Sequence, residues 1–185
     1  MLRKLAQFSV VASLLAWPQH PLAQMVNENI LADMPEGYKV ASQKRQNGIT
    51  QVEMIPQDQT LENWQEMFIV RIFHNSPLSL EAIEKQTASR WFAACPAAAY
   101  KSDHRGIENG YDISFFFLIC PNLQKSGKPM SRMVKALRGR DSLYLTQAVF
   151  KRPLTRDIVE EWTPFMTKIG LCDTRDETRA CPPGL

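Results

Sequence analysis

The residues best suited to chemistry in this chain stand together in one cluster, Asp103-His104-Arg105. A histidine beside a carboxylate can move a proton, so a small envelope hydrolase using His104 with Asp103 or a distant partner is one hypothesis. The cluster lies in a polar stretch that ends at Gly106, which is also typical of a solvated loop or an edge strand. His74 follows an apolar run, and we expect it in a turn or a cap.

Sequence signatures of common catalytic and cofactor sites are missing from the chain. It has no G-x-S-x-G or H-E-x-x-H motif, no S-x-x-K before a helix and no glycine-rich phosphate loop. The acidic residues Asp173, Asp176 and Glu177 alternate with Arg175 and Arg179 and depart from calcium-loop spacing. We therefore expect no metal and no cofactor, and the leading interpretation is a protein without catalytic activity.

The N-terminal segment predicts export. Residues 1–23 begin with basic side chains, continue through the 13-residue apolar run Leu5–Trp17 and offer Ala23 as a small residue for cleavage. This is the pattern of a secretory signal peptide, and the run is shorter than the ~20 residues that span a bilayer. We expect residues 24–185 to form a single periplasmic or secreted domain without a transmembrane anchor.

The four cysteines are predicted to form two disulfides, because an even number in an oxidising compartment favours pairing. Three pairings are possible. Cys172 and Cys181 enclose a short polar loop, while Cys95 ends a predicted helix and Cys120 a predicted strand. We favour Cys95–Cys120 and Cys172–Cys181. Metal ligation is the weaker alternative, since no C-x-x-C or nearby Cys/His spacing is present.

Basic residues gather in one part of an otherwise balanced chain. The chain has 22 Lys+Arg, 19 Asp+Glu and a formal net charge of +3. Within 125–156, Asp141 is the one acidic residue among nine basic ones: Lys125, Lys128, Arg132, Lys135, Arg138, Arg140, Lys151, Arg152 and Arg156. This distribution predicts a basic face on a hairpin.

Such a basic face attracts an anionic protein, a lipid headgroup or an acidic polysaccharide. The residues we expect to make this contact are Lys135, Arg138, Arg140 and Arg152. Nucleic acid is not expected, because no base-stacking aromatic residues are interleaved with the charges. The alternative is that the charges only keep an edge strand soluble.

Strand patterns dominate the coarse prediction of secondary structure. Asn47-Gly48 predicts a hairpin between Tyr38–Gln46 and Ile49–Ile55. A second hairpin is expected around Gly139, from strands over 130–138 and 142–151. The apolar runs 68–73 and 111–120 read as strands buried in a sheet.

Three helices are expected between and after these strands. A short one starts at Thr60, a longer one runs from about Ser79 to Ala94, and a third starts at Thr155. Within the second, we expect Glu81, Glu84 and Lys85 to face solvent. The fold class predicted is α+β, a mainly antiparallel sheet with two longer helices and one short helix packed on one face.

The opening of this domain resembles known proteins. Pro35-Glu36-Gly37-Tyr38, Glu53-Met54-Ile55-Pro56 and Trp64-Gln65-Glu66-Met67 resemble the start of uncharacterised secreted bacterial proteins. More distantly, residues 35–73 are similar to the PsbP/MOG1-like group of α+β domains. That group consists mostly of binding, adaptor or accessory proteins, which is the role the resemblance implies.

The leading functional prediction is a non-catalytic exported binding or accessory protein, with a periplasmic immunity protein as one form of it. The envelope hydrolase using His104 is an alternative from a different class. A structural envelope component that associates with itself is the third.

Overall fold

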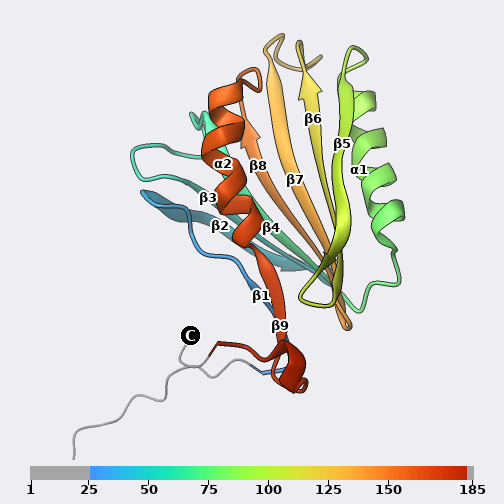
Figure 1. Cartoon of the computed structure of the whole chain (residues 1–185). Helices are drawn as coiled ribbons and strands as arrows, with labels where there is room; N and C mark the ends of the chain where they lie inside the picture. Colours follow the sequence, from blue (N-terminus) through green and yellow to red (C-terminus); the bar gives the residue numbers. More distant parts are fainter. Residues whose placement is uncertain (1–25, 183–185) are drawn as a thin grey trace, which may run out of the picture.

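The structure, a computed structural model, describes residues 26–182, so the predicted signal peptide lies outside the described residues. A seven-stranded antiparallel sheet has the order β2-β3-β4-β8-β7-β6-β5, and a second sheet pairs β1 with β9 (Figure 1). The elements are β1 (Glu28–Leu31), β2 (Tyr38–Gln46), β3 (Ile49–Pro56), β4 (Glu66–His74), α1 (Leu80–Ala94), β5 (Ala99–Glu108), β6 (Tyr111–Cys120), β7 (Met130–Arg138), β8 (Ser142–Phe150), α2 (Arg156–Lys168), β9 (Gly170–Asp173) and a 3-10 turn, η1 (Glu177–Arg179).

Local sequence signals placed most of these elements correctly. Asn47 and Gly48 both adopt positive φ, 51° and 72°, which closes the hairpin of β2 and β3. The expected hairpin around Gly139 is β7–β8. Ser79 caps α1 and Thr155 caps α2, each through its side-chain oxygen. The α+β class and the mainly antiparallel sheet are confirmed.

The short helix expected from Thr60 is wrong, because this segment forms a turn. The side chain of Asn63 accepts hydrogen bonds from the backbone N–H and the hydroxyl of Thr60, at 2.8 and 3.1 Å. Strand β4 then starts at Glu66, so Phe68 belongs to the sheet. Two helices, α1 and α2, therefore accompany the strands of the described part. The aromatic, β-branched run of β4 outweighs the helical spacing that precedes it.

The two helices cover opposite faces of the sheet, so the expectation that they share one face is also wrong (Figure 1). On β6, Phe115 packs in the cluster around Trp162 of α2, whereas Phe116 packs in the cluster around Trp91 of α1. The run YDISFFFLIC of β6 is apolar on both faces, so it needs a covering layer on each side of the sheet.

Both predicted disulfides are confirmed. Cys95–Cys120 joins the end of α1 to the end of β6, and Cys172–Cys181 joins β9 to the segment that follows η1. Among residues 26–182, the structure contains no helix long and apolar enough to cross a membrane.

The first described strand is tied to the far end of the chain and to the central hairpin. β1 pairs with β9, Glu28 opposite Asp173. The carboxylate of Glu28 also accepts hydrogen bonds from three successive backbone N–H groups of the β7–β8 turn, those of Arg140, Asp141 and Ser142. The β1–β9 sheet therefore anchors the turn beside it.

Candidate functional site

The structure does not bring the four predicted contact residues together, and it removes Lys135 from the surface. The Lys135 side chain is 2% exposed, on the α2 face of β7. Its Nζ donates to the carbonyls of Thr167 and Ile169 at the end of α2, at 3.1 and 2.7 Å, and pairs with Glu108 at 2.6 Å. A cation at a helix C-terminus is favourable. Lys135 fastens α2 to the sheet and cannot present charge to a partner.

The three arginines of the predicted set lie at two ends of the β7–β8 hairpin. Arg138 and Arg140 are beside the turn, and Arg140 is exposed. Arg152 follows the other end of β8 and pairs with Glu66 at 2.8 Å. Arg138 is the one of these three arginines that lines the pocket at the start of α1, because its strand ends beneath that helix.

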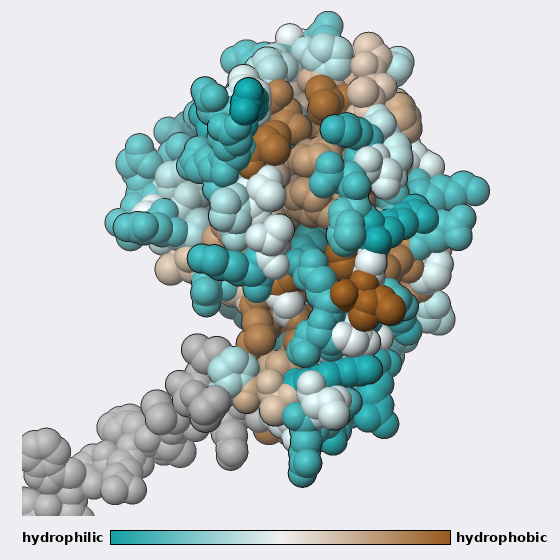
Figure 2. Space-filling model, viewed as in Figure 1, coloured by the Kyte–Doolittle hydropathy of each residue, from teal (hydrophilic) through white to brown (hydrophobic). Residues whose placement is uncertain are grey.

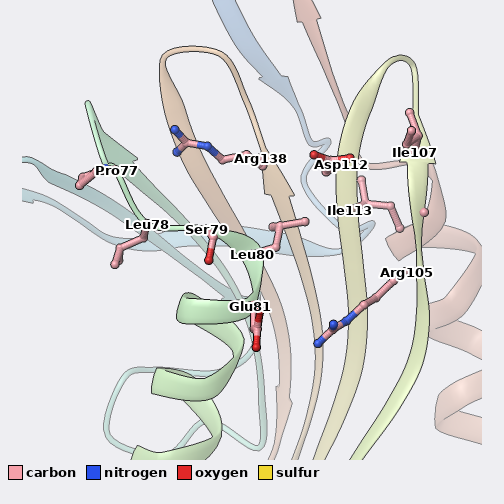
Figure 3. A pocket seen from close by; sticks show the side chains of 11 residues that line it. Pro77, Leu78, Ser79, Leu80, Glu81, Arg105, Ile107, Asp112, Ile113 and Arg138 are labelled. Carbon is pink, nitrogen blue, oxygen red and sulfur yellow. The ribbon is translucent and has the colours of Figure 1, made fainter.

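This pocket, here called the α1 pocket, has a volume of about 630 Å³ and lies between the first turn of α1 and the ends of β5, β6 and β7. Its apolar side chains come from the helix start and the sheet: Pro77, Leu78, Leu80, Ile107 and Ile113. In Figure 3, Leu80 lies between Arg138 on one side and Arg105 on the other. Strands β5 and β7 thus bring two guanidinium groups to one cavity beside the start of α1.

A buried carboxylate holds one of these guanidinium groups in place. Glu84 is 4% exposed, which corrects the expectation that it faces solvent. It accepts hydrogen bonds from Arg105 and Ser114 at 2.8 Å, and another from Tyr100. Because the carboxylate is paired and hydrogen-bonded, it can remain under the helix. Arg105 is therefore fixed at the rim, with its charge largely balanced by Glu84.

The second guanidinium group, that of Arg138, is available to a partner. Its Nη1 donates to the carbonyl of Ser76 at 2.7 Å, and it forms no ion pair with any described residue. Two acidic residues of the α1 pocket, Glu81 and Asp112, likewise have no ion pair within 26–182. The α1 pocket combines an apolar interior with free charges of both signs.

His104 lines a different pocket, of about 350 Å³, between β5 and α2. Figure 2 shows apolar surface (brown) in this region, between the helix and the edge strand. The ring of His74 hydrogen-bonds to Thr50 at 2.9 Å, but no serine hydroxyl or carboxylate in the described chain bonds to the ring of His104. That ring instead lies over Gly106, where a Cβ would come 2.8 Å from Nε2. The pairing that the hydrolase hypothesis needs is not formed.

Comparisons with known proteins return distant structures. No protein-family model matches the chain, and no curated protein is similar to it in sequence. The Ran-binding protein Mog1p of Saccharomyces cerevisiae is 12% identical, with 76% of this chain and 85% of that one covered and a TM-score of 0.45. PsbP of the cyanobacterium Synechocystis is 11% identical, with 80% and 94% covered and a TM-score of 0.39. Both structures agree with the distant resemblance of residues 35–73 to the PsbP/MOG1-like group, and a likeness this distant carries no argument about function.

Proposed function

We propose that this chain is an exported binding or accessory protein that docks a segment of a partner polypeptide in the α1 pocket. The observation that carries this proposal is the composition of the pocket. Leu80 and Ile113 supply an apolar interior, and Arg138 supplies a positive charge that forms no ion pair with a carboxylate of the described chain. Small binding sites commonly pair an apolar surface with a few polar groups that fix orientation.

The chemistry of the pocket favours a polypeptide over a lipid headgroup or an acidic polysaccharide. Glu81 and Asp112 would repel a densely anionic ligand, and such a ligand would have no apolar group to bury in the interior of the pocket. Ile107 stands 72% exposed on the edge strand β5, next to the cavity. The partner segment is expected to offer an apolar side chain to Leu80 and Ile107 and an acidic group to Arg138.

Export is part of the same proposal. Both disulfides need an oxidising compartment to form and persist, and the sequence of residues 1–23 has the pattern of a cleaved leader. The partner is therefore sought in the cell envelope or the medium, where the disulfide-bonded protein is expected to work.

Site-specific photo-crosslinking in the producing cells tests the docking. A photoreactive residue replaces Ile107, and the matched control replaces Val40, which is 54% exposed on the opposite edge strand, β2. We expect one protein adduct from position 107, none from position 40, and loss of the adduct when Arg138→Glu is added. The same adducts from both positions, or an adduct that survives Arg138→Glu, would refute the proposal.

A further inference from the structure

Two arginines stand on the α1 face of the sheet, on strands separated by β8 and away from the α1 pocket. Arg71 is on β4 and Arg132 on β7, and β8 runs between these strands. In the strand register, Arg71 is opposite Leu145 and Arg132 is opposite Val149. The residue between these two on the same face of β8 is Gln147. A row of three polar side chains therefore crosses an otherwise apolar part of the sheet.

Hydrogen-bond donors outnumber acceptors around Arg132. Its Nη1 donates to Oε1 of Gln147 at 3.0 Å, and its guanidinium lies 4.5 Å from the centre of the Trp91 ring of α1. Gln147 is 0% exposed. Arg132 Nε, Gln147 Nε2 and Trp91 Nε1 are buried without an acceptor among the described residues. Buried polar groups normally have partners, so this donor excess calls for an explanation.

Arg71 adds further donors without adding a paired acid. Its Nε donates to Oε1 of Gln51 at 2.5 Å, and the Gln51 amide donates to Glu53 at 2.6 Å. Glu53 therefore contacts Arg71 through Gln51. Neither Arg71 nor Arg132 forms an ion pair within residues 26–182. An arginine normally uses its planar fork on a carboxylate or a phosphate.

The positive charges of Arg71 and Arg132 also repel each other. Burial, followed by the charge of Arg71, lowers the pKa of Arg132 to about 10. Burial lowers the pKa of Arg71 as well, and the charge of Arg90 on α1 acts in the same direction, opposed by Glu53. Like charges held together and partly removed from water raise the free energy of the folded chain unless an anion joins them.

We propose that Arg71 and Arg132, with the amide of Gln147 between them, bind a phosphate-type oxyanion. A doubly charged oxyanion neutralises both guanidinium groups and supplies the acceptors that this face lacks. The ligand is either free phosphate or the phosphate group of a monoester. The site lies beside the C-terminal half of α1, where Trp91 is, so it is separate from the α1 pocket and does not depend on the proposed docking of a polypeptide.

Calorimetric titration of the disulfide-bonded protein tests this site. Inorganic phosphate, glycerol phosphate, acetate and chloride are compared at one ionic strength. The variants are Arg71→Gln and Arg132→Gln, and the matched control is Arg45→Gln, which removes an exposed charge from β2. We expect phosphate binding by the wild type and the control, and a Kd raised by about tenfold or more in each site variant. Tighter binding of glycerol phosphate than of free phosphate assigns the site to an ester.

The thermal unfolding temperature, measured with and without phosphate, separates loss of phosphate binding from loss of folding in the variants. Without phosphate, Arg71→Gln is expected to unfold at or above the wild-type temperature, because it removes the repulsion between Arg71 and Arg132. With phosphate, only the wild type and Arg45→Gln should gain stability, since a ligand stabilises the state that binds it. Equal effects of phosphate, acetate and chloride, or an unchanged phosphate response in both site variants, would overturn the proposal.

Discussion

Replacing Lys135 by methionine tests whether this lysine supports the fold or serves the surface. The substitution keeps an unbranched side chain of similar size and removes the Nζ contacts to Glu108, Thr167 and Ile169. The carbonyl of Ile169 is the buried acceptor of the three, and leaving it without a donor costs about 1–3 kcal/mol. The ion pair adds up to about 1 kcal/mol, since the Glu108 side chain is 37% exposed. We expect a loss of about 1–4 kcal/mol in the free energy of unfolding.

Urea unfolding measures this loss, with Lys128→Met as the matched control, because Lys128 is an exposed lysine of the same basic segment. The control is expected to change the free energy of unfolding by less than about 0.5 kcal/mol. Hydrogen exchange should also become faster at the last turn of α2, where Lys135 contacts the helix. A Lys135→Met protein as stable as the control would show that the lysine does not fasten α2.

Three further predictions concern the ends of the chain and its cross-links. Removing Cys95–Cys120 with alanines should cost about 3.5 kcal/mol and removing Cys172–Cys181 about 2.6 kcal/mol, because the sequence separations are 25 and 9; the reverse order of urea midpoints would contradict the loop-entropy reasoning. Hydrogen bonds from Arg175 lower the pKa of Asp173 from 3.8 to about 2. This stabilisation is complete only above about pH 5 and is lost as the pH falls towards 2, so Asp173→Asn should flatten the acid limb of the stability curve; an unchanged limb would exclude Asp173 as its source. Intact-mass analysis of protein from the envelope should give a chain starting near Gln24; a full-length mass would rule out cleavage.

Sequence patterns within a few residues predicted most of the fold. They did not predict which side chains are buried between the sheet and a helix. Asn47-Gly48, the caps Ser79 and Thr155 and the cysteine pairs act within a few residues or through compartment chemistry, so the sequence reveals them. Local signals do not show that both faces of β7 are covered. Its alternation of polar and apolar residues predicts one face in solvent, whereas α1 covers one face and α2 the other. The sequence therefore predicts an exposed Lys135 on a basic face, and the structure buries this side chain between β7 and α2.

The sites show the same division. Arg138 could be selected because it belongs to a run of basic residues, but nothing local indicates that it lines a pocket with Arg105. Arg71 is the one charged residue of the apolar run 68–73, and its place beside β8, on the same face as Arg132, depends on the strand order, in which β8 lies between β4 and β7. In the sequence, the one indication of this site is a single charged residue within an apolar run.

The pairing of β1 with β9 makes assembly depend on two segments that lie far apart in the sequence. Among the strands of residues 26–182, β1 is synthesised first, and its partner residues 170–173 are synthesised after the other strands. Until they appear, Glu28 has the turn of the central hairpin to bind but no strand to hold it there. A chain that stops short of Gly170 therefore keeps a free strand at its start.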